Sequence, residues 1–168
     1  MTLNELNQLD PQAAATCFRQ CCVSEAWVQG MLQARPFSSE ASLFAEASRI
    51  WAGLEKNDYL QAFEGHPKIG DVSSLRAKYA DTKALAAGEQ SSVDIANEAT
   101  INALAEGNQQ YEARFGYIFI VCATGKSAEE MLALLTERLH NDTETEIHLA
   151  AAEQNKITQI RLQKLLQN

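Results

Sequence analysis

The spacing of apolar residues along the chain predicts helices almost throughout. Between Ser39 and Leu54, apolar side chains recur every three or four residues, which is the repeat of one buried helix face. The stretch from Ser91 to Tyr111 keeps the same repeat over a length that crosses a whole domain. We therefore predict an all-α fold, a bundle of seven or eight helices that forms a single domain over residues 1–168.

Capping patterns divide this repeat into separate helices. A side-chain oxygen at the N-cap accepts a hydrogen bond from the first turn of the helix, and a capping box adds a glutamate that reaches back. Two capping boxes are predicted to open the last two helices, Ser127 with Glu130 and Thr143 with Glu146. The other predicted caps are Asp10 before Pro11, Ser24, Ser39 and Asn57.

One segment departs from the helical repeat. Residues 117–123 read Tyr-Ile-Phe-Ile-Val-Cys-Ala, the most apolar and β-favouring run of the chain, and they follow Gly116. Because no partner strand is evident in the sequence, we predict an irregular, extended and buried segment. Its backbone N–H and C=O groups then need partners, and a polar ligand is one candidate.

Composition and charge restrict the partners and the cellular location that we expect. The 168 residues carry a net charge of −8, and the 14 basic residues are dispersed, so nucleic acid is a poor candidate partner. No stretch has the length and hydropathy of a membrane span, and the first ten residues lack the features of a signal peptide. The four cysteines show no C-x-x-C spacing. We expect reduced thiols and a cytoplasmic protein with no membrane partner.

A histidine stands at a predicted corner of the chain. The residue before a proline is pushed out of the helical region, so the preceding helix is predicted to end at Gly65 and to leave His66 before Pro67 in an extended position. Glu89 and Gln90 lie in a break between helical segments further on. A pocket that combines these groups suits acid/base chemistry. The alternative is that His66 only caps a helix end.

An arginine occupies the apolar face of the last predicted helix. At 100° per residue, Arg161 falls on the same side as Ile147, Ala150 and Gln154. A guanidinium there needs an anion or several carbonyl oxygens, because an unpaired buried charge is costly. Two explanations stay open: an internal salt bridge, for example to Glu89, or a bound ligand. His140 and His148 lie on helix surfaces without other ligands nearby, so no metal site is predicted.

Four separated blocks of sequence resemble one family. They read HPKIGD at 66–71, EQ at 89–90, YEARFGYIFIVCATG at 111–125 and RLHNDTETEIHLAAAEQNKITQIRLQKL at 138–165. In order and spacing they resemble the 2-oxo-4-hydroxy-4-carboxy-5-ureidoimidazoline (OHCU) decarboxylases of urate breakdown, over almost the whole chain. The resemblance implies an all-α carboxy-lyase that needs no cofactor and converts this unstable intermediate to (S)-allantoin. A homodimer is the expected assembly.

The resemblance also implies roles for individual residues. His66 matches the catalytic histidine of the family and Glu89 its essential glutamate. At Ala86, many members carry a hydroxyl residue, so a substrate hydrogen bond there is lost or comes from water or the backbone. The implied substrate-binding positions are Pro67, Ala86, Gln90, Arg161 and the backbone of Phe119, Ile120, Val121, Cys122 and Ala123.

Two other functions compete with this one. The first is a non-catalytic helical interaction module whose apolar excess serves a dimer. The second is a cofactor-free hydrolase or isomerase that acts on a related ureide in the same pocket. Convergence of His66, Glu89 and Arg161 on one cavity favours an enzyme, whereas separations beyond about 15 Å favour the module.

Overall fold

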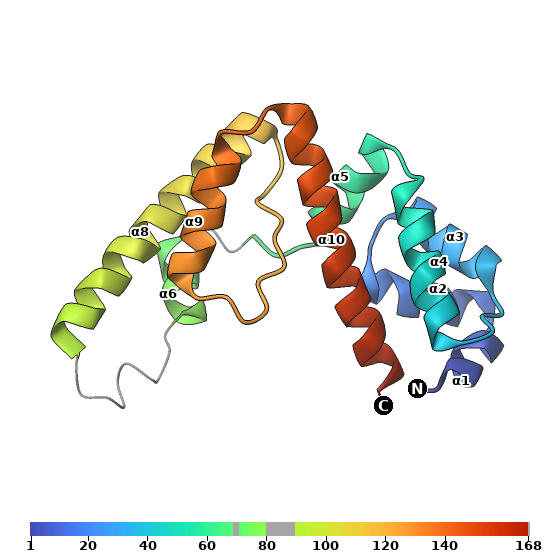
Figure 1. The fold of residues 1–168 in the computed structure, drawn as a ribbon. Coiled ribbons are helices and arrows are strands. Elements are labelled where there is room, and N and C mark those ends of the chain that lie inside the picture. The colour runs from blue at the N-terminus through green and yellow to red at the C-terminus, as the bar shows by residue number, and fades with distance from the viewer. Residues whose placement is uncertain (69–70, 80–89, 168) are drawn as a thin grey trace. The chain divides into compact units, whose positions relative to one another are not determined.

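The computed structural model describes residues 1–68, 71–79 and 90–167, and of residues 90–97 the backbone alone (Figure 1). Over these residues the chain is helical without any strand, which confirms the predicted all-α class. The described part holds nine helices, close to the roughly seven or eight predicted. They are α1 (Leu3–Gln8), α2 (Pro11–Cys21), α3 (Glu25–Ala34), α4 (Glu40–Ala52), α5 (Lys56–Glu64), α6 (Val72–Lys78), α8 (Gln90–Phe115), α9 (Ala128–Leu139) and α10 (Thr143–Leu166).

The helices belong to two compact units. Unit 1 comprises Met1–His66, Ile120–Cys122 and Ile147–Asn168, and therefore holds α1 to α5 and most of α10. Unit 2 comprises Pro67–Phe119 and Ala123–Glu146, and holds α6, α8, α9 and the first turn of α10. The single domain over 1–168 stays a prediction.

Two buried tryptophans hold the core of unit 1 together. The indole N–H of Trp27 on α3 donates to the carbonyl of Ala47 on α4 at 3.1 Å. The indole N–H of Trp51 on α4 donates to the carbonyl of Ala151 on α10 at 2.8 Å. A buried aromatic ring contributes a large apolar area, and its N–H needs a partner when it is removed from water. These two contacts therefore join α3 to α4 and α4 to α10.

Most predicted helix starts are confirmed. The side chains of Asp10, Ser24 and Ser39 accept hydrogen bonds from the first turns of α2, α3 and α4, and Ser127 forms the predicted capping box with Glu130. The cap predicted at Asn57 is wrong. Helix α5 begins one residue earlier, at Lys56, and Glu55 and Asp58 form its capping box.

The capping box predicted for α10 is also wrong. Thr143 is the first helical residue, and the carboxylate of Asp142 accepts from the N–H of Thr145 at 2.7 Å. Glu146 is instead fully buried and pairs with Arg138. An aspartate one position earlier is as good an N-cap as a threonine, which frees Glu146 for the interior.

The buried face of α10 is wider than the helical repeat predicts. At 100° per residue Gln159 falls almost opposite Arg161, a position that predicts exposure, yet it is half-buried and donates to the carbonyl of Phe44 on α4 at 3.1 Å. Thr158 and Leu162 are buried as well, whereas Arg161 is half-buried. Because α10 packs against more than one helix of unit 1, its buried face is wider than a single apolar stripe indicates.

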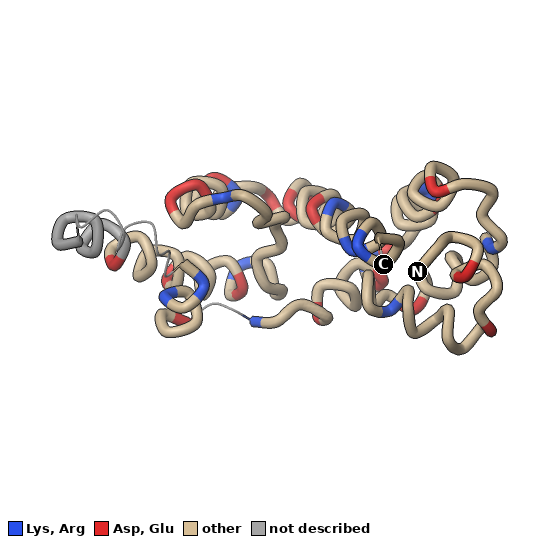
Figure 2. The backbone as a smooth tube through the Cα atoms, turned by 90° about the horizontal axis from the view of Figure 1, so that it is seen from below, with Lys and Arg blue, Asp and Glu red and all other residues tan. Residues whose placement is uncertain are grey.

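Unit 2 is built on the pair α8 and α9. Gly107 on α8 allows the close approach, since a Cβ atom at this position would lie 2.7 Å from the Leu135 side chain on α9. None of the described helices is both long and apolar enough to cross a membrane. Figure 2 shows Lys and Arg distributed over several helices rather than gathered on one, in line with the predicted dispersal of basic residues.

Candidate functional site

His66 lies just beyond helix α5, as the last residue of the segment Met1–His66 of unit 1. The helix ends at Glu64 with Gly65 as its C-cap, one residue before the predicted end, and the N–H of His66 donates to the carbonyl of Phe63 at 3.2 Å. Pro67, exposed to solvent, prevents the helix from continuing. His66 therefore lies two residues beyond the end of α5, and its backbone is hydrogen-bonded to the last turn of this helix.

Gly65 is required at this corner by a close contact. A Cβ atom there would lie 2.5 Å from Cγ2 of Val23, and valine is too short and stiff at χ1 to move away. We expect Gly65→Ala to destabilise the protein by about 1–3 kcal/mol through overpacking. Urea unfolding measures this, with Gly53→Ala as the control, since its added Cβ meets only carbonyl oxygens at 3.7 Å. Equal effects of both substitutions would contradict this role of Gly65.

The ring of His66 is half-buried and makes a short hydrogen bond to α10. Its Nε2 atom lies 2.5 Å from Oε1 of Gln154, a side chain that is 1% exposed. Burial lowers the pKa of His66 below its ordinary value, the bond to Gln154 opposes this, and the positive charge of Arg161 lowers it further. The imidazole is therefore neutral at pH 7 and able to take up a proton.

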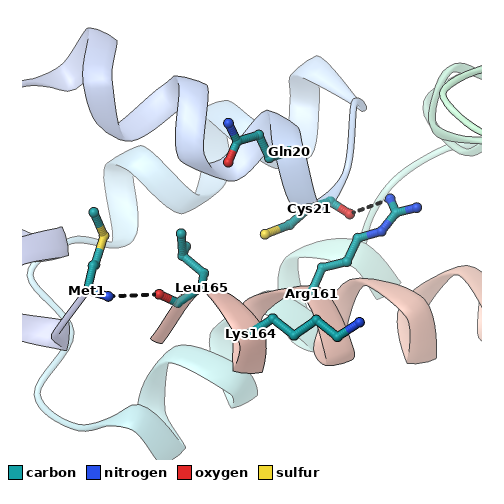
Figure 3. A pocket seen from close by; sticks show the side chains of 6 residues that line it. All are labelled: Met1, Gln20, Cys21, Arg161, Lys164 and Leu165. Carbon is teal, nitrogen blue, oxygen red and sulfur yellow. Dashed lines mark hydrogen bonds between the residues drawn. The ribbon is translucent and has the colours of Figure 1, made fainter. Parts of the chain in front are cut away.

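Arg161 lies on the same unit and lines a cavity. Its guanidinium donates to the carbonyl of Cys21 at 3.2 Å, and among the described residues it forms no ion pair. The cavity has a volume of about 410 Å³. Figure 3 shows Arg161 and Lys164 on the α10 side and Cys21 on the α2 side. The lining residues are Met1, Gln20, Cys21, Arg161, Lys164 and Leu165, without His66.

Arg161 therefore donates to a carbonyl oxygen, which is one of the two kinds of partner predicted for it, an anion or carbonyl oxygens. The predicted internal salt bridge is not formed with any residue that the structure describes. Glu89, its predicted acidic partner, lies outside the described residues, so whether these two side chains meet stays a prediction. With Lys164 one turn further along α10, the cavity carries two positive side chains and suits an anionic or carbonyl-rich molecule.

Cys21 and Cys22, on whose thiols the charge of Arg161 acts, are not activated as nucleophiles. Burial raises the pKa of the Cys21 thiol to about 12 and that of the Cys22 thiol to about 11. The positive charge of Arg161 opposes the shift in both cases but does not outweigh burial. A thiol is a strong nucleophile only as the thiolate, so both residues act as neutral packing groups at physiological pH. All four cysteines are free thiols, as predicted.

Residues 117–123 form the irregular segment predicted from the sequence, without helix or strand. In the part that belongs to unit 1, Ile120 and Cys122 are buried and Val121 is half-buried. The N–H of Cys122 donates to the carboxylate of Glu153 on α10 at 3.0 Å. One backbone group of the predicted substrate-binding segment is thus held by the protein itself. Phe119 and Ala123, both half-buried, belong to unit 2.

A buried ionic cluster in unit 2 was not predicted from the sequence. Glu146 is fully buried and accepts hydrogen bonds from Arg138, Tyr111 and Asn141. Burial, and next the bond to Glu146, raise the pKa of the Tyr111 hydroxyl well above its ordinary value. The guanidinium of Arg138 also lies 4.6 Å from the ring centre of Phe119. The cluster therefore fixes the first residue of the predicted substrate-binding segment.

The sequence carried a signal for this cluster. Arg138 continues the buried face of α9 that Met131 and Leu135 define, at spacings of four and three residues. An arginine in that register predicts a buried acidic partner, because a lone buried charge is not tolerated.

Three predicted site residues have no described side chain. Ala86 and Glu89 lie outside the described residues, and Gln90 is known only as the first residue of α8. Among the described residues, no group of three His, Cys, Asp or Glu side chains is arranged to hold a metal ion. Both histidines are exposed, His148 on the surface of α10 as predicted and His140 as the C-cap residue that follows α9.

The fold and the described residues together define a class: an all-helical protein with a half-buried histidine and, in the same unit, a cavity that an arginine lines. The family model of OHCU decarboxylase matches residues 7–163. The chain belongs to the OHCU decarboxylase family.

Individual relatives agree with this assignment. A uric acid degradation bifunctional protein of Arabidopsis thaliana is 36% identical over 150 residues, 88% of this chain, and an OHCU decarboxylase of Amia calva is 33% identical over 79% of this chain and 75% of its own. A crystal structure of OHCU decarboxylase in the presence of (S)-allantoin aligns with a TM-score of 0.70 and 34% identity, covering 90% of this chain and 97% of the other.

The relatives also differ from this chain in length. The chain spans 46% of the Arabidopsis protein, and 32% of a uric acid degradation bifunctional protein of a Bacillus species that is 28% identical to it. A structure of (S)-allantoin synthase, at a TM-score of 0.73 and 18% identity, shares the fold.

Proposed function

We propose that this protein is a carboxy-lyase that converts OHCU to (S)-allantoin and carbon dioxide without a cofactor. The observation that carries the proposal is the half-buried, neutral His66 with Arg161 within electrostatic reach, in a chain of the OHCU decarboxylase family. A second support is the 34% identical structure that was determined in the presence of (S)-allantoin.

The substrate supplies its own electron sink. Its carboxylate leaves a carbon that also bears a hydroxyl group and adjoins a C=N bond. As the C–C bond breaks, its electron pair moves into the C=N system, so that no metal, pyridoxal or thiamine is required. The ring nitrogen of the former C=N bond takes up a proton, the hydroxyl proton leaves as the carbonyl of allantoin forms, and one proton is added to the neighbouring carbon. Starting from the carboxylate, the reaction therefore releases carbon dioxide, takes up one proton and relocates a second from the hydroxyl group to carbon.

His66 is suited to that relocation. Its neutral imidazole takes up the hydroxyl proton and returns a proton to one face of the ring, as a general base and then a general acid. Glu89 is proposed as its catalytic partner, which relays a proton or holds a ring N–H.

Binding is assigned to the remaining residues. The planar fork of Arg161 suits the carboxylate or carbonyl oxygens of the substrate. Pro67, Gln90 and the backbone of 119–123 are proposed to contact its amide-like groups, and at Ala86 water or a backbone group replaces the family's hydroxyl. The related-ureide and interaction-module alternatives have no specific observation in their favour.

We expect Arg161→Lys to weaken the binding of (S)-allantoin by about 1.5–3 kcal/mol, the range of a charge-assisted hydrogen bond. Lysine keeps the charge but lacks the fork that reaches two oxygens. Isothermal titration calorimetry measures the affinity. The matched control is Arg49→Lys, an exposed arginine on α4 that pairs with Glu46, and it should bind like the wild type. Arg161→Lys with wild-type affinity and lower thermal stability would remove Arg161 from the site.

The proposed activity is tested by generating OHCU in place from urate with the upstream enzymes. The protein should accelerate the decay of the intermediate, followed by ultraviolet absorbance, together with the release of carbon dioxide. A decay rate equal to that without the protein would favour the non-catalytic module. Accelerated decay to a product other than allantoin would favour an enzyme of a related ureide.

We also propose a homodimer located in the cytoplasm. The four free thiols support a reducing compartment. The dimer rests on the family resemblance, and sedimentation velocity tests it.

A further inference from the structure

The side chain that holds His66 is itself part of a buried polar chain. Gln154, 1% exposed, places Nε2 of its amide 3.0 Å from the hydroxyl oxygen of Thr158, one turn further along α10. Thr158 is 3% exposed, and its side chain also acts on the thiol of Cys22, where it opposes part of the pKa rise caused by burial. Buried amides and hydroxyls need such partners, because an unsatisfied one is costly.

The direction of this chain follows from the two ends of the Gln154 amide. Its NH₂ group can only donate, and it lies at the hydroxyl oxygen of Thr158, which accepts. The amide oxygen of Gln154 then faces His66, and only a protonated Nε2 can donate to it.

We propose that Gln154 is a positioning residue for His66, whose buried amide keeps the imidazole proton on Nε2 and leaves Nδ1 as the nitrogen that accepts and returns the substrate proton. The assignment of Nδ1 rests on the proposed function. A buried hydrogen-bond acceptor beside one ring nitrogen keeps the proton on that nitrogen and so selects the histidine tautomer. Among the described residues, Nδ1 of His66 has no hydrogen-bond partner.

The neighbouring charges leave this tautomer intact. Arg161 lies on α10 like Gln154, and its positive charge disfavours the doubly protonated ring of His66. Cys21 and Cys22 are neutral thiols at pH 7. A neutral ring with its proton on Nε2 is therefore the expected resting form.

The test is long-range ¹H–¹⁵N NMR of the histidine rings in the free protein. The chain has three histidines, so the His66 signals are identified by their loss in His66→Ala. We expect the Nε2–H tautomer in the wild type, a mixture of tautomers and a lower pKa in Gln154→Leu, and the Nε2–H tautomer with a raised pKa in Gln154→Glu. The matched control is Gln159→Leu, which removes an amide of α10 that contacts Phe44 and not His66.

Kinetics provide a second measurement. Gln154→Leu should lower the turnover number at least about tenfold, the usual cost of losing a group that orients a functional side chain, with little change in the affinity for (S)-allantoin. Gln154→Glu should restore much of the turnover and move the acidic limb of its pH profile to higher pH.

A wild-type His66 protonated on Nδ1, or a folded Gln154→Leu with the wild-type tautomer, would overturn the proposal. If Gln154→Leu does not fold, Thr158→Val takes its place, with Thr158→Ser as its control. Valine should release the amide and alter the tautomer, and an unaltered tautomer in Thr158→Val would equally overturn the proposal. The NMR readout needs no substrate, so it fails or succeeds independently of the decarboxylase activity.

Discussion

Replacement of His66 by alanine is expected to lower the rate of (S)-allantoin formation by at least about 100-fold, the low end of the contribution of a general acid or base. The imidazole is a half-buried group whose pKa is lowered by burial and, to a smaller extent, by the charge of Arg161, and alanine can neither accept nor return a proton. Because His66 lies after the end of α5 and not within the core, circular dichroism and the melting temperature should stay close to those of the wild type.

The matched control is His148→Ala, which removes an exposed histidine of α10. This variant should retain wild-type turnover. If His66→Ala also retained turnover within a few-fold of the wild type, the catalytic assignment of His66 would be wrong. If it lost activity only because it unfolded, the melting curve would show this directly.

The second large effect concerns stability. Glu146→Gln is expected to lower the free energy of unfolding by about 3–5 kcal/mol, because it leaves the Arg138 cation buried without its carboxylate. Both side chains are almost fully removed from water, at 0% and 8% exposed. Urea unfolding followed by circular dichroism measures the change.

Glu98→Gln serves as the control for this substitution. Glu98 pairs with Arg76 in an exposed salt bridge, with side chains 44% and 54% exposed. Such pairs contribute at most about 1 kcal/mol, since water already solvates both charges. Losses of equal size in the two variants would contradict the special role assigned to the buried cluster.

The local features of the fold were predictable because local chemistry decides them. Asp10, Ser24, Ser39 and Ser127 cap helices as predicted, since an N-cap depends on one side chain and the next three backbone N–H groups. The corner at His66 follows in the same way from Pro67. Where two neighbouring residues were both capable caps, as at Asp142 and Thr143, the sequence did not discriminate between them.

The tertiary partners of the site were not predictable in this way. His66 and Gln154 are 88 residues apart, and the helical repeat places Gln154 on the inner face without stating what it meets. Arg161 is similar: the repeat predicted a partner, and packing selected the carbonyl of Cys21. The positions of Ala86 and Glu89 lie outside the described residues, so the catalytic pair of His66 and Glu89 rests on the resemblance.

The most direct test of the proposed function is the handedness of the product. OHCU is generated from urate in the presence and absence of the protein, and circular dichroism follows the allantoin that forms. We expect an excess of the (S)-enantiomer that grows with protein concentration, because a proton delivered by a fixed group reaches one face of the ring. Racemic allantoin at every protein concentration would contradict the account.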